Sequence, residues 1–511
     1  MLKRGFGGRG GEVGMVGCIL AIDQGTTSTK AIVVDESGSI RATSGNFGIT
    51  ALHPKPGWVE FDPEQMLGSV VAAAEDALDR AGLRRGDVAA VGLANQGETV
   101  IAFDAELGQP IHNAISWQDK RGSEIVERWR ANGIESEAVR RTGLRLDPYF
   151  SASKMRWVIE SLPEARRLLG AGRLRLGTSD AWLLAKLTGE FVTDVSTASR
   201  TMLFDLESMS WDAVLLEATG IPVECLPAVV DNAPTLRLKR PREAPALSSM
   251  PMAGLCVDQQ AALFGQRRFA RGQAKATYGT GCFVLANAGD ASDSRRDGVL
   301  TSVGWRIGDS TAYVFDGGIY SAGSMLNWLR DGLGLFSDFD EMERLASSVD
   351  DPGGVCLFPA FAGLGAPYWE SGARAAFVGL TLGTGREHIA RATAEAIAFR
   401  VKDVVDTMNG PDLRIDSLCV DGGLTRSSLL MQLQADLLGV PLVRGESHEA
   451  TAYGVALMAG IGSGMWTGTG DLPAAEPRVT FEPRRCAVTD GLLGRYERWR
   501  EVAREMIRCR V

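Results

Sequence analysis

The sequence lacks the patterns that most often reveal a disulfide framework, a structural zinc site or a common phosphate-binding loop. Its 511 residues include eight cysteines, none of them in a CxxC pair, and only four histidines, which lie far apart. It contains no Gly-Lys pair and therefore no Walker-type loop. We predict no disulfide framework and no structural zinc, and single cysteines in apolar segments fit a reducing, cytoplasmic compartment.

Positive charge and long apolar runs are also scarce. The formal net charge of −9 argues against nucleic acid as a partner. The longest uncharged run, residues 450–470, is interrupted by glycines, so we predict no membrane insertion. Residues 1–17 match G-x-G-x-x-G without a preceding strand, and we interpret them as a disordered Gly-rich extension in which Met15 is an alternative start.

The chain is long enough for more than one hydrophobic core. Strand-like and helix-like segments alternate along it, which predicts an α/β architecture. A Pro-rich, charged stretch at 232–251 interrupts this alternation, and an apolar segment follows it. We therefore predict two domains, residues 18–265 and residues 266–511.

A polar turn lies between two predicted strands in each half of the chain. In "AIDQGTTSTKAIVVD" it follows Asp23, and in "ATYGTGCFVLAN" it includes Thr280 and Gly281. Backbone N–H groups and hydroxyls beside a carboxylate suit an anion plus a metal ion, although a plain turn is the alternative. Two such turns would hold a polyphosphate from both sides. The residues of the first turn are Gly25, Thr26, Thr27 and Ser28.

Two further segments carry candidate chemistry. In "SLCVDGGLTRSSLL" a strand ends at Asp421, and two glycines precede a helix, which permits close approach of another group. Asp258 follows the apolar strand 254–257 and precedes an apolar helix. From the residues alone, its carboxylate is either a proton acceptor or the N-cap of that helix.

Together these segments resemble the FGGY family of carbohydrate kinases, and in particular its members that act on glycerol. The resemblance extends from about Cys18 to the C-terminus and includes "HPKPGWVEFDP", "DPYFSASKMRW", "TASRTMLFDL", "DQQAALFGQ", "TYGTGCF" and "FAGLGAPYW". It implies two actin-like (ribonuclease-H-like) ATPase domains flanking a central cleft. ATP would lie against the second domain and a polyol or sugar against the first, and a homo-oligomer (dimer or tetramer) is expected.

The resemblance also assigns roles to residues. Asp258 would be the catalytic base, and Asp23 and Asp258 would hold Mg²⁺ through water. Family members often have Gln at position 327 and Asn at position 427, where this chain has Asn327 and Ser427. The residues implied to bind ATP are Asp23, Gly25, Thr26, Thr27, Ser28, Thr280, Gly281, Gly323, Asn327, Gly422, Gly423 and Ser427.

The implied substrate site contains one departure from the family pattern. Members that act on glycerol have Arg where this chain has Gly97, so donors to substrate hydroxyls are lost and volume is gained. Phosphorylation of a small polyol at a terminal hydroxyl, glycerol to glycerol 3-phosphate, stays the first hypothesis. A tetritol or pentulose kinase, a site completed by Arg121, and a catalytically silent nucleotide-binding sensor are the alternatives. The implied substrate residues are Gly97, Glu98, Trp117, Tyr149, Asp258, Gln259 and Phe283.

Overall fold

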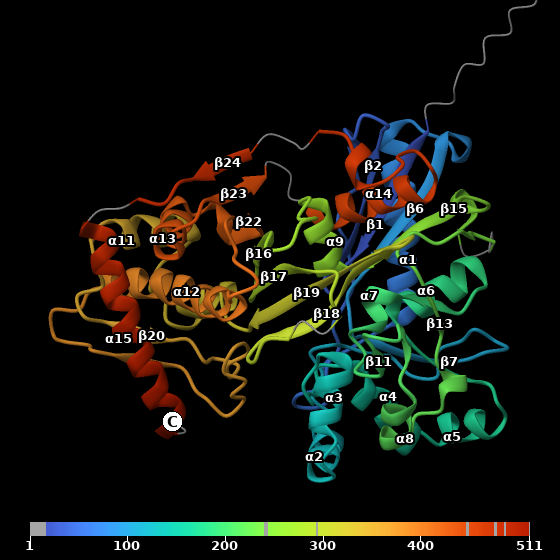
Figure 1. Ribbon diagram of the computed structural model, residues 1–511, viewed down its shortest axis with the longest axis horizontal. Coiled ribbons are helices and arrows are strands. Elements are labelled where there is room, and N and C mark those ends of the chain that lie inside the picture. The colour runs from blue at the N-terminus through green and yellow to red at the C-terminus, as the bar shows by residue number, and fades with distance from the viewer. Residues whose placement is uncertain are drawn as a thin grey trace, which may run out of the picture.

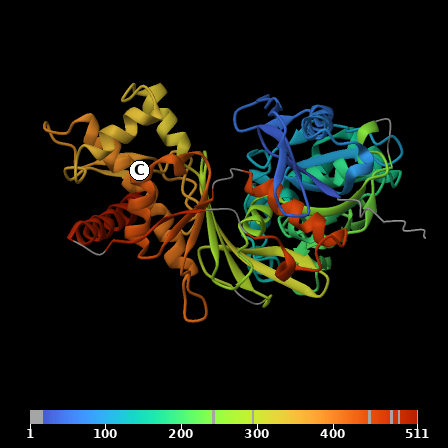
Figure 2. The same ribbon diagram turned by 90° about the horizontal axis from the view of Figure 1, so that it is seen from above.

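Two mixed β-sheets form the centres of two domains that lie side by side (Figures 1 and 2). The structure, a computed structural model, describes residues 17–239, 244–292, 295–445, 449–474, 478–484 and 487–509. The expected N-terminal extension therefore lies, apart from Gly17, outside the described residues. The alternation of strands and helices confirms the predicted α/β class.

The first sheet has the strand order β14-β15-β6-β1-β2-β3, and β4 also pairs with β2. Strands β1 and β2 form an antiparallel hairpin, whereas β6 runs parallel to β1 and β15 runs parallel to β6. The strands are β1 (Cys18–Gln24), β2 (Ser28–Val34), β3 (Ile40–Thr43), β4 (Phe47–Gly48), β6 (Val88–Asn95), β14 (Leu236–Arg237) and β15 (Pro251–Val257).

Helices cover both faces of this sheet. Successive side chains of a strand point to opposite faces, so Leu20 and Ile22 pack with α1 (Pro63–Ala81), whereas Ile19 and Ala21 pack with α14 (Ala450–Gly462). Burial on both faces explains the continuous apolar runs Cys18–Ile22 in β1 and Ala31–Val34 in β2.

Helix α1 shows how local sequence sets the bounds of an element. The side chain of Asp62 accepts the N–H of Glu64, and Pro63 occupies the first helical position. Gly82 ends the helix with φ +67°, a conformation that favours glycine. Both bounds of this helix therefore have a local cause in the sequence.

The second sheet repeats the arrangement of the first, with the order β18-β19-β17-β16-β22-β23-β24. Strands β16 and β17 form an antiparallel hairpin, and β22 runs parallel to β16, just as β6 runs parallel to β1. This recurrence agrees with two domains of one fold. The strands are β16 (Ala274–Tyr278), β17 (Cys282–Gly289), β18 (Leu300–Ile307), β19 (Ser310–Ile319), β22 (Leu418–Asp421), β23 (Leu442–Gly445) and β24 (Arg478–Phe481).

Helix α14 returns from the second half of the sequence to the first domain, beside β1, β2 and β6 (Figure 1). A Cβ on Gly92 would lie 2.6 Å from the carbonyl oxygen of Val455, so the helix and β6 are in backbone contact. The hydroxyl of Tyr453 also donates to the carbonyl oxygen of Gly38 at 3.0 Å. A boundary at residue 265 divides the sequence into two halves. Helix α14 belongs to the second half of the sequence, but it packs on the first domain.

Smaller elements complete the two domains. None of the helices in the described ranges is long and apolar enough to cross a membrane. The first domain also contains β5 (Glu60–Phe61), β7 (Val100–Asp104), β8 (Ala114–Ile115), β9 (Leu174–Thr178), β10 (Val192–Asp194), β11 (Phe204–Asp205), β12 (Ser210–Trp211), β13 (Ala228–Val230), α2 (Ser123–Ala131), α3 (Glu135–Thr142), α4 (Ser151–Ser161), α5 (Pro163–Gly170), α6 (Ser179–Thr188), α7 (Val195–Ala198), α8 (Ala213–Thr219) and α9 (Asp258–Gly265). The second contains β20 (Cys356–Phe358), β21 (Ala376–Val378), α10 (Gly323–Asn327), α11 (Phe339–Ser347), α12 (Arg386–Met408), α13 (Ser428–Leu438) and α15 (Ala487–Cys509).

Candidate active site

Two carboxylates stand at the same edge of the first sheet. Asp23 pairs with Ala94 of β6, and Asp258 directly follows Val257, which pairs with Asn95 of the same strand. Because β1 and β15 flank β6, the two backbones are separated by two strand spacings, about 10 Å. The structure thus brings together the two residues that were expected to face a metal ion.

The negative charge of Asp23 is poorly compensated. Burial, followed by the carboxylates of Asp258 and Glu449, raises the pKa of Asp23 to about 8, although Lys30 acts in the opposite direction. Lys30 is itself paired with Glu449, with 2.7 Å between Nζ and Oε1. Such a carboxylate is protonated at neutral pH unless a cation joins it, so the environment of Asp23 suits a divalent cation.

Asp258 is the first residue of α9 and does not cap that helix. The N-cap residue is Val257, without a side-chain bond, and Oδ1 of Asp258 accepts the backbone N–H of Gln259 at 2.7 Å. The N-cap interpretation is therefore wrong. Burial raises the pKa of Asp258 above its ordinary value, and Lys275 opposes this effect. A carboxylate with a raised pKa is a stronger proton acceptor than an exposed aspartate.

Lys275 is a buried cation that sequence reasoning missed. It lies on β16 of the second domain, and its Nζ donates to Oε1 of Gln259 at 2.6 Å and to Oγ1 of Thr277 at 2.8 Å. Phe283 pairs with Thr277 across the β16–β17 hairpin, so the three residues share one face. The available signal was a lysine within a short run of apolar and small residues.

Glu98 occupies a strained turn between β6 and β7. Its φ is +52°, and the N–H of Thr99 donates to the carbonyl oxygen of Gly97 at 2.6 Å, which closes a γ-turn. Positive φ is uncommon for glutamate, and such strain concentrates at functional sites. The turn places the side chain inside the protein, where Glu98 is 4% exposed.

A buried arginine, Arg200, contacts Glu98. Its Nε donates to Oε1 of Glu98 at 2.7 Å, and its Nη1 lies 3.0 Å from Oδ2 of Asp316 on β19. Burial raises the pKa of Glu98, and Arg200 is the strongest opposing influence. In the sequence Arg200 is only one letter of "TASRTMLFDL", and no local pattern predicts its contact with so distant a residue.

Aromatic residues connect the candidate polyol site with the first polar turn. The rings of Trp117 and Tyr149 meet edge to face with centroids 5.6 Å apart, and the guanidinium of Arg200 lies 5.7 Å from the Tyr149 ring. Trp117 Nε1 donates to Oγ1 of Thr26 at 2.9 Å. The turn itself is closed by a bond from the N–H of Gly25 to the carbonyl oxygen of Ser28 at 3.1 Å, and Thr27 is exposed.

The space beside Gly97 is partly occupied. A Cβ built on Gly97 would lie 2.8 Å from Cγ2 of Val257. Less room is available at this position than the glycine alone suggests, and a longer side chain would have to displace the valine.

Arg121 does not complete the site. Its Nε donates to Asp119 at 2.9 Å, its Nη2 donates to Glu60 at 2.6 Å, and its side chain is buried. The guanidinium lies 3.8 Å and 4.6 Å from the ring centroids of Trp58 and Trp157. These contacts hold Arg121 in place, so the hypothesis that it replaces the missing family arginine is wrong.

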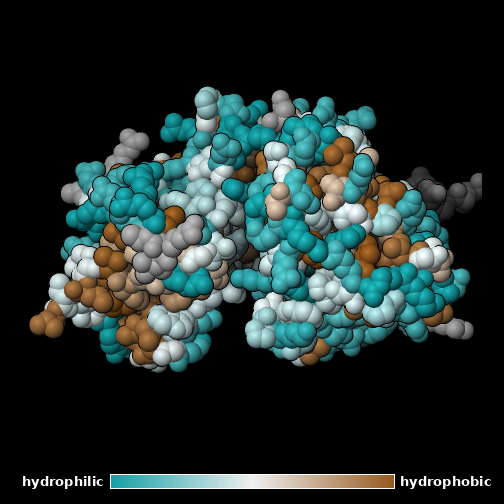
Figure 3. All heavy atoms as spheres, turned by 90° about the horizontal axis from the view of Figure 1, so that it is seen from below, coloured by the Kyte–Doolittle hydropathy of each residue, from teal (hydrophilic) through white to brown (hydrophobic). Residues whose placement is uncertain are grey.

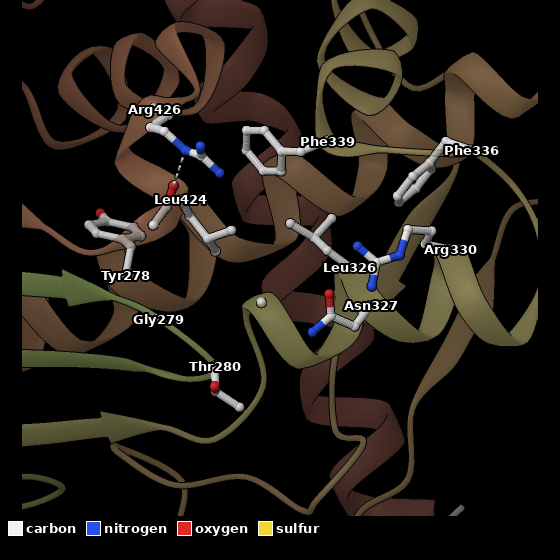
Figure 4. Close-up of a pocket in the computed structure, with 12 residues that line it drawn as sticks. Tyr278, Gly279, Thr280, Leu326, Asn327, Arg330, Phe336, Phe339, Leu424 and Arg426 are labelled. Atoms are coloured by element: carbon white, nitrogen blue, oxygen red, sulfur yellow. Dashed lines mark hydrogen bonds between the residues drawn. The ribbon is translucent and has the colours of Figure 1, made fainter. Parts of the chain in front are cut away.

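A pocket of about 260 Å³ opens in the second domain between the β16–β17 turn, α10 and the turn Gly423–Arg426 (Figure 4). In the close-up, Asn327 and Arg330 come from one continuous helical segment, and Phe339 and Arg426 approach from across the pocket. The residues that line it are Tyr278, Gly279, Thr280, Gly323, Leu326, Asn327, Arg330, Phe336, Phe339, Gly423, Leu424 and Arg426.

Four of the predicted nucleotide residues line this pocket: Thr280, Gly323, Asn327 and Gly423. The phenylalanines, Arg330 and Arg426 were missed. The spacing of positions 323, 327 and 330 on one helical face could have revealed the first arginine, whereas the others lie on separate elements.

Gly281, Gly422 and Ser427 are sequence neighbours of lining residues, whereas Asp23 and the turn Gly25–Ser28 belong to the first domain. Gly422 has φ +92°, and a Cβ there would lie 2.5 Å from the carbonyl oxygen of Tyr278. A Cβ on Gly281 would lie 2.5 Å from the carbonyl oxygen of Ile319. The hydroxyl of Ser427 caps α13 by accepting the N–H of Leu430 at 3.0 Å, and it donates to Glu343.

Gly323→Ala is expected to raise the KM for ATP by about ten- to a hundredfold, because small displacements of binding groups are costly. The new Cβ would lie 2.6 Å from the carbonyl oxygen of Gly279, which belongs to the backbone of the pocket turn. Steady-state kinetics with varied ATP test this. Gly68→Ala in α1 is the control, because its Cβ would meet nothing within 4 Å. Equal ATP constants in the two variants would contradict the assignment of this pocket.

Viewed from below, the two domains are separated by a notch in the space-filling surface (Figure 3). Two contacts cross from one domain to the other near the site, namely Arg200 to Asp316 and Lys275 to Gln259. These contacts link the part of the first domain that carries Glu98 and Asp258 to the sheet that carries the pocket.

Comparisons with known proteins agree with this geometry. Residues 18–265 match the N-terminal domain of the FGGY family of carbohydrate kinases, and residues 274–463 match its C-terminal domain. Glycerol kinase of Koribacter versatilis is 44% identical over 91% of this chain and 94% of its own length. That of Alkalilimnicola ehrlichii is 45% identical over 94% and 95%. The crystal structure of Plasmodium falciparum glycerol kinase with ADP superposes with a TM-score of 0.88 at 30% identity, covering 96% of this chain and 98% of the other.

Proposed function

Because the chain belongs to the FGGY family of carbohydrate kinases, we propose that it transfers the γ-phosphoryl group of ATP to a terminal hydroxyl of glycerol, giving glycerol 3-phosphate. The observation that carries this proposal is a cluster in which Glu98, Tyr149 and Asp258 influence one another electrostatically and Trp117 packs on Tyr149. Lys275 of β16, the strand that runs to the pocket turn, contacts Gln259 next to Asp258. Phosphoryl transfer depends mainly on positioning and on charge stabilisation, and this site supplies both.

In this proposal Asp258 accepts the proton of the attacking hydroxyl. Glu98 accepts a hydrogen bond from a neighbouring hydroxyl, and Trp117, Tyr149 and Phe283 form apolar walls against the carbon chain. Lys275 holds the side-chain amide of Gln259 and thereby orders the start of α9. The sensor alternative lacks support, because both carboxylates needed for transfer are present.

The nucleotide lies, in this proposal, between the two polar turns. Gly25, Thr26, Thr27, Ser28, Thr280 and Gly281 contact the phosphates, and Gly323, Asn327, Gly422, Gly423 and Ser427 surround the adenosine. The guanidinium of Arg330 and the ring of Phe339 provide further contacts, since both line the pocket. Phenylalanine rings and arginine planes are suited to an adenine face.

Mg²⁺ is the cofactor that these residues fit. The described residues contain no group of three or more His, Cys, Asp or Glu side chains that would hold a metal by themselves. Two carboxylates, Asp23 and Asp258, fit the usual manner of Mg²⁺ binding by one or two carboxylates, water and substrate phosphates. When bound, Mg²⁺ neutralises phosphate charge, and Asp23 and Asp258 would hold it through water.

Gly97→Arg is expected to improve the preference for glycerol over larger substrates by about ten- to a hundredfold, because an added charged hydrogen bond contributes about 1.5–3 kcal/mol. The new side chain also removes volume, which penalises erythritol and xylulose. Because its Cβ would lie 2.8 Å from Val257, the double variant with Val257→Ala is expected to show the full effect. The ratio of kcat/KM values for glycerol, erythritol and xylulose measures it.

Gly97→Ala is the matched control, since it adds the crowded Cβ without any donor. It is expected to lower kcat/KM for all three substrates by similar factors. A wild type that already prefers glycerol strongly, and whose preference Gly97→Arg weakens, would show that this pocket does not need an arginine at position 97.

We also propose a homo-oligomer (dimer or tetramer) in the cytoplasm. Apolar side chains extend into solvent beyond β21, where Val378, Leu380 and Leu382 are 37%, 56% and 111% exposed. Hydrophobic atoms protrude at the outer edge of the second domain (Figure 3). Free cysteines that are buried, such as Cys256 and Cys282, support a reducing compartment. Sedimentation of the wild type and of Leu382→Glu tests the assembly, since a charge at this tip should dissociate it.

A further inference from the structure

Arg200 joins the substrate site of the first domain to the second domain. It follows α7 and is 3% exposed. One nitrogen, Nε, bonds to Glu98 at 2.7 Å, and another, Nη1, lies 3.0 Å from Asp316. Asp316 belongs to β19, two strands away from β16 in the sheet that carries the second-domain pocket. The Glu98–Arg200–Asp316 triad therefore crosses the domain boundary.

The contact with Arg200 leaves one oxygen of Glu98 available. Among the described residues, Oε1 of Glu98 accepts a hydrogen bond and Oε2 accepts none. Oε2 is nevertheless not fully enclosed by the protein, so a ligand hydroxyl can reach it. The rings of Tyr149 and Phe150 lie 5.7 Å and 5.5 Å from the guanidinium and limit its movement. An ionised carboxylate is a stronger acceptor for a hydroxyl than a neutral acid.

Stability alone does not account for this triad. Burying three charged groups carries a large desolvation cost, and buried ion pairs are often no more stable than apolar replacements. The arrangement has a distinct geometric consequence, because the arginine that bonds Glu98 is also ion-paired with a strand of the other domain. Its position at the strained Glu98 turn points to a role in the reaction.

We propose that Arg200 is the positioning residue of the polyol site: it holds Glu98 as an ionised hydroxyl acceptor and, through Asp316, aligns that acceptor with the nucleotide-binding domain. This inference rests on the proposed function. It assigns to Arg200 a role in substrate recognition although Arg200 need not touch the substrate.

The first test is Arg200→Met. The KM for glycerol is expected to rise by about ten- to a hundredfold, while the KM for ATP stays within a few-fold of wild type. Loss of the cation raises the pKa of Glu98 further, so the fall of the glycerol KM with rising pH should occur at higher pH in this variant than in the wild type. The other charged groups that influence Glu98, namely Asp258 and Lys154, are unchanged in this variant.

Two further variants separate charge from alignment. Arg200→Lys restores the cation and is expected to return the pH dependence of the glycerol KM to that of the wild type. It should reverse only part of the increase in KM, because an ammonium group cannot reproduce both contacts. Asp316→Asn keeps the shape of the side chain and breaks the charged link to the second domain. It is expected to lower kcat by about tenfold with little change in the glycerol KM.

The matched control is Arg391→Met, which removes an equally buried arginine from α12, where its Nε bonds to Glu395 at 2.9 Å. It is expected to lower the melting temperature without changing the glycerol KM. If Arg200→Met and Asp316→Asn keep the wild-type constants and the wild-type pH profile, and lose only stability as the control does, the inference is overturned. Should Arg200→Met fail to fold, Asp316→Asn decides by its kcat. A wild type that phosphorylates no glycerol would instead reject the proposed function, before any variant is compared.

Discussion

Asp258→Asn is expected to lower turnover by about 10²–10⁴, the usual contribution of a general base, while fold and ATP affinity stay nearly unchanged. Asparagine keeps the shape of the side chain, and its oxygen can still accept the N–H of Gln259 that Oδ1 accepts at 2.7 Å. It cannot accept the proton of the attacking hydroxyl. Initial rates at saturating glycerol and Mg·ATP, together with nucleotide titration, measure both parts of this expectation.

The control for this substitution is Asp62→Asn, which alters a carboxylate that also accepts a neighbouring backbone N–H, that of Glu64 at 2.9 Å, but far from the site. It should leave turnover unchanged. In the wild type, activity should fall as the pH falls through the pKa of Asp258, and burial places this fall above the ordinary aspartate range. Asp258→Asn turnover within a few-fold of wild type would exclude Asp258 as the proton acceptor.

Asp23→Ala is expected to reduce phosphoryl transfer by about 10²–10³, comparable to the loss of one charge-stabilising group, while glycerol binding is retained. Asp23 lies at the end of β1, two strands from Asp258, and it serves the metal and the phosphates in our proposal. Calorimetry with glycerol and kinetics with varied Mg²⁺ separate the two effects. Loss of glycerol binding with normal use of Mg·ATP would show that this role is misassigned.

The same substitution has a consequence for stability. The pKa of Asp23 is about 8 in the folded protein and 3.8 in its ordinary state, so the folded state binds one more proton between these values. Without Mg²⁺, stability should therefore fall as the pH rises from about 4 to about 8. Asp23→Ala should lack this part of the slope and melt at a higher temperature than wild type at pH 8. Equal slopes in both proteins would contradict the buried, uncompensated environment of Asp23.

Elements and motifs with a local cause could be predicted from the sequence. Helix α1 has a capping aspartate, a proline at its first position and a terminal glycine, so its bounds follow from neighbouring residues. The polar turns at Gly25 and Thr280 are visible as glycine and hydroxyl residues between apolar strands. Asp23 and Asp258 could be paired only through the family resemblance, and the structure shows the cause, because β1 and β15 both flank β6 in parallel and end at the same sheet edge.

Contacts made by packing could not be predicted in this way. Arg200 reaches Glu98 across 102 positions, and Lys275 reaches Gln259 from the other domain. Arg121 is near Trp117 in the sequence, and this proximity suggested the wrong arginine. Two tryptophan rings and two carboxylates hold the Arg121 guanidinium away from the substrate site. The spacing of these residues in the sequence does not predict that they meet.

In our account, this protein transfers the γ-phosphoryl group of ATP to the oxygen of a terminal hydroxyl of glycerol. Incubation of the wild type with glycerol and γ-labelled Mg·ATP, followed by ³¹P NMR of the products, tests it most directly. We predict ADP and a single phosphate monoester, glycerol 3-phosphate, carrying the label. Inorganic phosphate as the only labelled product, or a labelled ester formed from xylulose or erythritol but not from glycerol, would contradict it.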